Sequence, residues 1–228
     1  LGIQSLLMGL HALDIQAVLA LTGDPLGAET GAGRSVFDLN SFTLTRLVAG
    51  LNRGVSQAGI NLKGETNFSL GVAFNSSAHN LAGEAQRLRR KAEEGARFVM
   101  TQPVFDADHG RRVLETVRPI GMKIFLGFFP LVSARSALYL HNEVPGIRIP
   151  EPVLKMLTAI ESKEDQAKAG LAACARLLDD LRNDLHDVSG GVYLIGPHNR
   201  AQLLAPLIRQ VCAWRNANIP GSRKERGD

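Results

Sequence analysis

The sequence predicts an α/β fold, because short apolar runs alternate along the chain with longer segments of helical periodicity. The short runs are nearly continuous in apolar residues, which is typical of parallel strands that helices cover on both faces. Five strand–helix units are visible, too few for a closed (β/α)8 barrel, which takes about 250 residues. The pattern therefore leaves two architectures open: an open doubly wound sheet, or the carboxyl-terminal part of a barrel.

The limits of the elements follow from the residues that begin and end them. Asn40 or Ser41 is suited to cap the second helix, and Gly95 ends the third without a Cβ penalty. Pro103 is expected to end the third strand directly after Gln102. The strands are predicted at residues 16–21, 67–74, 97–101, 123–128 and 191–195. The helices are predicted at residues 1–13, 41–59, 84–94, 108–118, 134–142, 151–160, 164–185 and 201–216.

Composition narrows the classes of protein to consider. The chain has 228 residues, is 45% hydrophobic, and carries a formal charge of +4, which permits an anionic ligand but does not call for nucleic acid. Aromatic residues are only 5% of the chain, without the interleaving of basic and aromatic residues that single-stranded nucleic acid sites use. Cys174 and Cys212 lack CxxC spacing, so we expect both to be reduced core residues. No apolar run reaches membrane-spanning length and no signal peptide is recognisable, so we expect a cytoplasmic protein with no membrane partner.

Polar residues gather where the predicted strands end. Asp24 follows the first strand, Asn75 the second, and Gln102 the third. Asn199 and Arg200 follow the fifth. Because the carboxyl ends of parallel strands meet at one edge of a sheet, this edge is the predicted functional site.

The helix at 84–94 carries the clearest charge pattern. Its acid and cations recur at helical spacing, which places them along one side of the helix. A solvated helix face and an anion-binding surface both account for this pattern. The residues concerned are Glu84, Arg87, Arg90 and Lys91.

Other motifs are weaker. Asp24, after Thr22 and Gly23, is suited either to tune a flavin or another heterocycle, or to cap a turn. His79 lies in the loop after the second strand, as a ligand contact or a surface residue. The loop GAGRSV lacks the third glycine of a dinucleotide fingerprint, and the histidines show no metal-ligand spacing, so no metal is predicted.

Seven stretches, in order along the chain, resemble the methylenetetrahydrofolate reductase family, the FAD-dependent (β/α)8 enzymes of one-carbon metabolism. The resemblance runs from about residue 1 to residue 218. MTQPVFD and LHNEVPGI resemble particularly the branch in which the reductase follows a homocysteine S-methyltransferase domain. The stretches are LALTGDP (19–25), SVFDLNSF (35–42), GVAFN (71–75), RLRRKAEEGARFVMTQPVFD (87–106), FLGFFPLVSARSA (125–137), LHNEVPGIRIP (140–150) and GVYLIGPHNR (191–200).

The resemblance implies a TIM barrel of which residues 1–219 carry roughly the last five βα units, with a polar tail at 220–228. It implies reduction of 5,10-methylenetetrahydrofolate to 5-methyltetrahydrofolate for methionine biosynthesis, with bound FAD and with NADH or NADPH as hydride donor. It also implies a homo-oligomer, and a fused or separate homocysteine S-methyltransferase as partner. Two alternatives remain: a flavin-binding or scaffold domain without turnover, and a pterin-binding methyltransferase barrel.

The resemblance also implies roles for individual residues. Thr22, Gly23 and Asp24 match a strand end that contacts the flavin, where Asp24 lies near both the flavin and the folate and serves catalysis. Phe37 and Phe74 stand where aromatic residues, often Tyr, flank the flavin.

The remaining roles fall on the cationic helix and on two substrate-side residues. Glu84, Arg87, Arg90 and Lys91 match the helix that holds the FAD ribose and pyrophosphate, and His79 is grouped with these cofactor contacts. Gln102 matches the amide that contacts the folate or the nicotinamide and serves catalysis, and Arg200 matches an arginine suited to the carboxylate tail of the folate.

Departures from the family pattern set limits on this reading. The family's catalytic Glu, at the end of its first strand, has no match in this sequence, and a second amide falls near Ser136, whose side chain is shorter. Thr22 stands where the family often has Arg. We therefore expect the sequence to be an incomplete barrel that lacks the first three strands and the catalytic acid.

Overall fold

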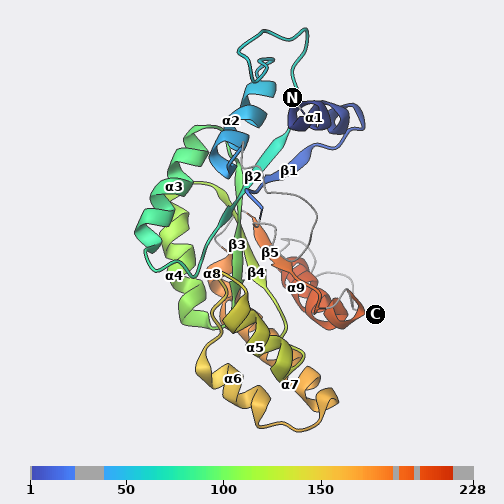
Figure 1. Ribbon diagram of the computed structural model, residues 1–228. Coiled ribbons are helices and arrows are strands. Elements are labelled where there is room, and N and C mark those ends of the chain that lie inside the picture. Colours follow the sequence, from blue (N-terminus) through green and yellow to red (C-terminus); the bar gives the residue numbers. More distant parts are fainter. Residues whose placement is uncertain (1, 24–38, 187–189, 198–200, 218–228) are drawn as a thin grey trace, which may run out of the picture. The chain divides into compact units, whose positions relative to one another are not determined.

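The computed structural model describes residues 2–23, 39–186, 190–197 and 201–217. A five-stranded sheet in the order β1-β2-β3-β4-β5 is accompanied by helices, which confirms the predicted α/β class (Figure 1). β1 pairs with β2 and β2 with β3, both in parallel. The strands are β1 (Ala17–Ala20), β2 (Ser69–Phe74), β3 (Phe98–Val104), β4 (Lys123–Phe128) and β5 (Gly191–Leu194).

Helices alternate with the strands along the chain. The α-helices are α1 (Gly2–Ala12), α2 (Ser41–Leu51), α3 (Leu81–Glu93), α4 (Ala107–Val117), α5 (Ala134–Glu143), α6 (Glu151–Thr158), α7 (Lys163–Asp180), α8 (Arg182–His186) and α9 (Ala205–Ala217). The 3₁₀ helices are η2 (Arg118–Ile120) and η4 (Ala201–Leu204). The chain divides into two compact units: the first is Leu1–Thr101 with Glu115–Phe125, and the second is Gln102–Leu114 with Leu126–Asp228.

Four predicted limits were wrong. β3 does not end before Pro103 but continues to Val104; its register with β2 reaches only Thr101, so the missing N–H of Pro103 does not interrupt that pairing. α2 ends at Leu51 because the side-chain amide of Asn52 exchanges two 2.9 Å hydrogen bonds with the backbone of Phe68. The single helix expected at 164–185 is divided into α7 and α8, and the one expected at 201–216 begins as η4.

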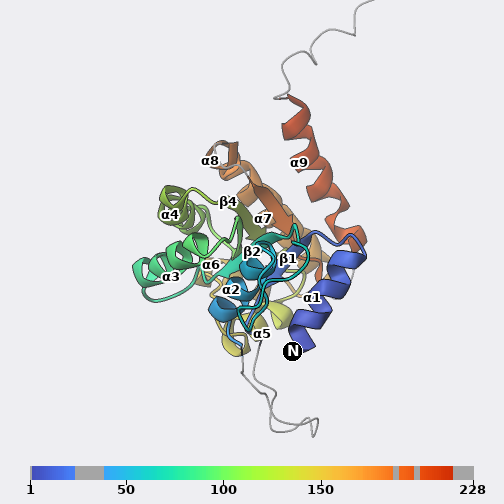
Figure 2. The ribbon, with the colours of Figure 1, turned by 90° about the horizontal axis from the view of Figure 1, so that it is seen from above.

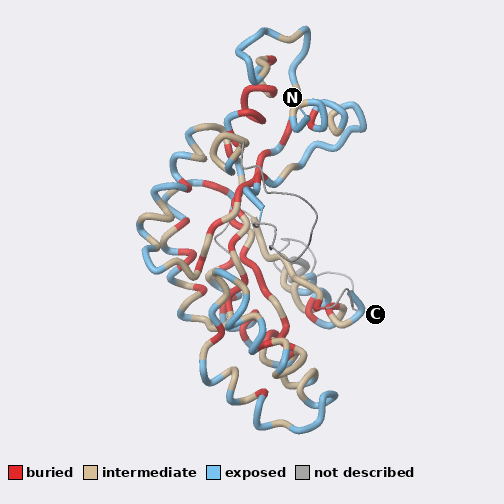
Figure 3. Tube along the Cα trace, viewed as in Figure 1, coloured by how far each residue is buried: buried red, intermediate tan, exposed pale blue. Residues whose placement is uncertain are grey.

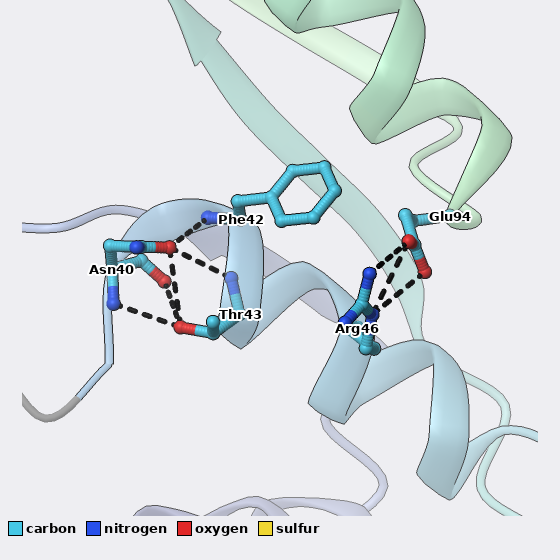
Figure 4. Close-up of polar contacts among 5 residues, drawn as sticks. All are labelled: Asn40, Phe42, Thr43, Arg46 and Glu94. Carbon is cyan, nitrogen blue, oxygen red and sulfur yellow. Dashed lines mark hydrogen bonds and ion pairs between the residues drawn. The ribbon is translucent and has the colours of Figure 1, made fainter.

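The core of the first unit lies between β2 and helices α2 and α3. Val48, Leu51 and Leu70 are at most 1% exposed, and Figure 3 shows buried positions running along the strands. α1 lies beside β1, and its His11 ring meets Phe68 edge-on at 6.0 Å between ring centroids (Figures 1 and 2). Asn40 caps α2 by accepting N–H bonds from two residues of its first turn, as one of the predicted alternatives had it (Figure 4).

The second unit has a core of its own. A cluster of buried apolar residues links α5, α6 and the residues that follow β4; its members are Leu131, Ala137, Ile149 and Leu157. An adjoining apolar cavity is lined by Phe105, Phe129 and Cys174, among others. Burial raises the pKa of the Cys174 thiol to about 12, so this cysteine is a neutral packing residue, as predicted.

Two expectations about burial were wrong. β1 and β5 are edge strands in the observed order, and they are not covered on both faces: Leu19 of β1 is 37% exposed and every residue of β5 is only partly buried. Cys212 is exposed on α9 rather than part of the core.

Two strands carry a glycine over which an aromatic ring from the next strand lies. A Cβ atom on Gly71 of β2 would stand 2.8 Å from Cδ2 of Phe98, its partner in β3. The Phe98 ring also meets Phe125 of β4 edge-on at 5.6 Å. In the second unit, a Cβ atom on Gly127 of β4 would stand 2.7 Å from Cζ of Tyr193 in β5. Both positions therefore exclude any side chain while the ring is in place.

Candidate functional site

α3 is the element that positions the predicted cofactor residues, and local sequence explains where it begins and ends. The Asn80 side chain accepts a 2.9 Å hydrogen bond from the N–H of Gly83, which caps the helix. Gly95 has a φ of +119°, and the N–H of Ala96 closes the last turn on the carbonyl of Lys91 at 3.0 Å. Leu88 is the buried contact of the helix with the core.

Glu84, Arg87 and Lys91 form one electrostatic cluster on α3. Glu84 accepts a 2.9 Å bond from Arg87, and the Glu84 side chain is only 14% exposed. Burial lowers the pKa of the Lys91 ammonium, with a smaller opposing effect from Glu84 and a smaller reinforcing one from Arg87. Within the described part of the chain, Lys91 forms no ion pair. A partly dehydrated cation beside a carboxylate already bound to Arg87 is suited to an anionic ligand.

Arg90 does not share this cluster. Its guanidinium lies over the Phe42 ring of α2, 4.9 Å from the ring centroid. Arg46 of α2 lies 5.3 Å from the same centroid and binds Glu94 at 2.6 Å, as Figure 4 shows for the ion pair. The predicted set of four charged residues along one side is thus divided, and Arg90 instead joins α3 to α2 by a cation–π contact. Helical spacing carries no signal for this tertiary contact.

The end of β2 supplies a hydroxyl that sequence reasoning did not single out. Phe74, the last residue of β2, is fully buried and pairs with Thr101. Asn75 turns the chain by accepting a bond from the N–H of Ser77 at 3.1 Å. The Ser77 hydroxyl is buried and finds no hydrogen-bond partner among the residues that the structure describes. His79 is exposed in the same loop.

The end of β1 is anchored to the start of α2. The hydroxyl of Thr22 accepts a 2.9 Å hydrogen bond from the N–H of Ser41. Gly23 has a φ of +77°, is exposed, and would have no atom within 4 Å of an added Cβ, so its backbone is open to a close approach. Three predicted site residues lie outside the described residues: the flavin contacts Asp24 and Phe37, and the substrate arginine Arg200.

In the second unit, Gln102 lies within β3 and is half-buried. Its side-chain Nε2 donates a 3.4 Å hydrogen bond to the carbonyl of Pro145. The predicted amide is therefore oriented by a loop that lies 43 residues further along the chain. Ser136, where a second amide was expected, donates its N–H to the Ser133 side chain in the first turn of α5.

The described ranges carry neither of two other kinds of site, a metal centre or a membrane span. They contain no group of three or more His, Cys, Asp or Glu that could hold a metal ion. No described helix is both long and apolar enough to cross a membrane.

These observations define an α/β protein with a parallel sheet, a cationic helix after β2 and an oriented amide in β3. The model of the methylenetetrahydrofolate reductase family matches residues 1–190. The chain therefore belongs to the methylenetetrahydrofolate reductase family, whose fold is a TIM barrel. No curated protein matches the chain in sequence.

A solved structure with a similar fold is an uncharacterized protein from Clostridium thermocellum that binds two copies of 5-methyl-5,6,7,8-tetrahydrofolic acid. The two chains superpose with a TM-score of 0.50 at 14% identity, over 65% of this chain. The matched part spans 54% of the other protein's chain. At this level of identity, the likeness supports the fold.

Proposed function

We propose that the protein is a flavin-dependent oxidoreductase that reduces 5,10-methylenetetrahydrofolate to 5-methyltetrahydrofolate with NADH or NADPH. Membership in the methylenetetrahydrofolate reductase family supports an oxidoreductase acting on a folate. The product of the proposed reaction is the ligand named for the Clostridium thermocellum protein. The cluster of Glu84, Arg87 and Lys91 is the observation on this chain that carries the proposal.

The side chains of this cluster have the hydrogen-bond donors and acceptors that FAD requires. A diphosphate brings negative charge, and Lys91 is a partly buried cation without an ion pair among the described residues. Arg87 is 73% exposed in its side chain, which leaves most of its donors available, and the Glu84 carboxylate can accept bonds from ribose hydroxyls. The Ser77 hydroxyl adds a buried donor at the end of β2. FAD, when bound, supplies the hydride chemistry of the reaction.

The remaining roles belong to groups of the protein. Gln102 presents an amide, which can both donate and accept hydrogen bonds, to the pterin or the nicotinamide. Asp24 would hold a negative charge near the flavin, and Arg200 would bind the carboxylate tail of the folate. The family's proton donor has no match in residues 1–228, so the proposal assigns that proton to no residue of this sequence. A homo-oligomer, a cytoplasmic location and a homocysteine S-methyltransferase partner stay predictions.

An anaerobic flavin titration tests the proposal. The purified protein is mixed with FAD, then with NADH or NADPH, and finally with 5,10-methylenetetrahydrofolate. We expect the absorbance of the added FAD to fall at the second step and to return at the third, with 5-methyltetrahydrofolate as product. Binding of FAD without either change would favour a flavin-binding domain without turnover. Binding of folate with no binding of FAD would favour a pterin-binding methyltransferase barrel.

A further inference from the structure

The loop between α5 and α6 makes a tight turn beside Gln102. The N–H of Ile147 donates a 3.2 Å hydrogen bond to the carbonyl of Val144, which closes a four-residue turn. Pro145 and Gly146 occupy its two central positions, and Gly146 has a φ of +80°. Proline at the first central position and a positive φ at the second are the features of a type II β-turn. The turn is therefore preset by its sequence.

The turn contacts Gln102 on two atoms of the side-chain amide. The Pro145 carbonyl accepts a bond from Nε2 of Gln102 at 3.4 Å. A Cβ atom on Gly146 would lie 2.6 Å from Oε1 and 2.9 Å from Cδ of the same side chain. Since real Cβ atoms essentially never approach so closely, the amide occupies this position only because residue 146 has no side chain.

The turn is also fixed at its far end. Ile149 is 2% exposed in the apolar cluster of the second unit. The N–H of Ile149 donates a 3.1 Å hydrogen bond to Nδ1 of His141, which lies on α5. The stretch between the turn and α6 is therefore anchored at Ile149, by packing and by the hydrogen bond to His141.

We propose that the Pro145–Gly146 turn is a positioning element that holds the Gln102 amide in its substrate-binding orientation. A free glutamine side chain has several rotamers, and ordering it on binding lowers affinity. Here the bond to Pro145 and the bare Gly146 backbone select one orientation before the ligand arrives. The inference rests on the proposed function in one respect, because it takes Gln102 to contact the folate.

A double-mutant cycle tests this coupling with 5-methyltetrahydrofolate as ligand. Gln102→Ala should weaken binding about tenfold, as for loss of one or two neutral hydrogen bonds. Gly146→Ala should weaken it by roughly three- to tenfold, because the new methyl group displaces the amide. The double variant should bind no more weakly than Gln102→Ala alone, since the turn then has nothing left to position. Additive losses would overturn the proposal.

Gly121→Ala is the matched control, because Gly121 has a φ of +77° and nothing within 4 Å of an added Cβ. It carries the same backbone strain without a contact to Gln102. We expect Gly121→Ala to lower stability in urea unfolding about as much as Gly146→Ala while it leaves folate affinity unchanged. Equal loss of affinity in both variants would mean that backbone strain alone accounts for the effect.

A second measurement separates the positioning role from the proposed function. The signal is recorded in ¹⁵N–¹H spectra of the labelled protein without ligand. The side-chain NH₂ signal of Gln102 is identified as the one that disappears in the Gln102→Ala variant. Gly146→Ala should shift this signal and Gly121→Ala should not; an unmoved signal would refute the positioning role. If the unaltered protein binds no folate but the signal shifts as expected, the proposed function fails and the turn still orients Gln102.

Discussion

Replacing Lys91 by Met should change cofactor affinity and protein stability in opposite directions. Methionine keeps the length and the apolar stem of the side chain and removes its charge. Burial lowers the pKa of Lys91 below its ordinary value of 10.5, which means that the folded protein holds this charge at a cost. The same cost is the reason to expect a strong contact when an anion arrives.

The size of the binding effect follows from the kind of bond that is lost. A hydrogen bond to a charged group contributes about 1.5–3 kcal/mol, so we expect FAD to bind roughly ten- to a hundredfold more weakly to the Lys91→Met variant. Arg89→Met is the matched control, because Arg89 lies exposed on the same helix. It should change FAD affinity by less than about threefold at moderate salt, since exposed charges are largely screened.

The stability effect has a defined sign and pH range. Because the pKa of Lys91 is lower in the folded than in the unfolded protein, the unfolded chain binds more protons between the two values, and stability rises with pH across that interval. Below both values the full cost is present, so Lys91→Met without ligand should be more stable than the unaltered protein at neutral pH. The difference should shrink toward pH 10.5, where the unfolded lysine also loses its charge.

Two measurements check these expectations. Quenching of flavin fluorescence gives the FAD affinity of the three proteins, and urea unfolding followed by circular dichroism gives their free energies of unfolding at several pH values. If Lys91→Met bound FAD as tightly as Arg89→Met, Lys91 would hold no phosphate, which would refute its assignment as a cofactor contact. A variant that is less stable at neutral pH would contradict the account of its burial.

Other outcomes follow from single contacts. A Cβ at Gly170 would collide with the backbone carbonyl of Leu131, so Gly170→Ala should lower the free energy of unfolding by about 1–3 kcal/mol in urea titrations; an unchanged midpoint would contradict this packing. Asn40→Ala removes the cap of α2 and should cost about 1 kcal/mol, read from the same titrations, whereas Asn40→Asp should retain most of it. A thiol reagent at pH 8 should label the exposed Cys212 within minutes and Cys174 only after unfolding, because burial raises the pKa of the Cys174 thiol to about 12. Mass spectrometry of the digested protein distinguishes the two labelled cysteines. Rapid labelling of Cys174 would show that its burial is transient.

Local signals predicted most of the elements. β4 was predicted with its observed limits, and Asn40 was a predicted cap of α2, because alternating composition and capping act within a few residues. Two of the wrong limits arose where residues distant in sequence intervene. Asn52 ends α2 by binding the backbone of Phe68. β3 continues through Pro103 because its pairing with β2 ends at Thr101, so the missing N–H of Pro103 removes no bond between these two strands. Neither cause is visible within the segment concerned.

In the candidate site, too, contacts within one helix were predicted and contacts between distant segments were not. The spacing of Glu84, Arg87 and Lys91 predicted a cluster that the structure contains. The stacking of Arg90 on Phe42 and the contact of Gln102 with Gly146 join residues far apart in sequence. A Pro-Gly pair indicates a turn, but no sequence pattern shows which side chain the turn will face.

The glycines that lie beneath aromatic rings have a consequence for the evolution of this chain. Gly71 and Phe98 divide a single space between them, as do Gly127 and Tyr193. A mutation that enlarges either glycine can be accepted only after its ring has become smaller, so each pair should drift jointly. In a broad set of homologous sequences, we expect positions 71 and 98 to covary in size, with total volume nearly constant, and positions 127 and 193 to behave alike.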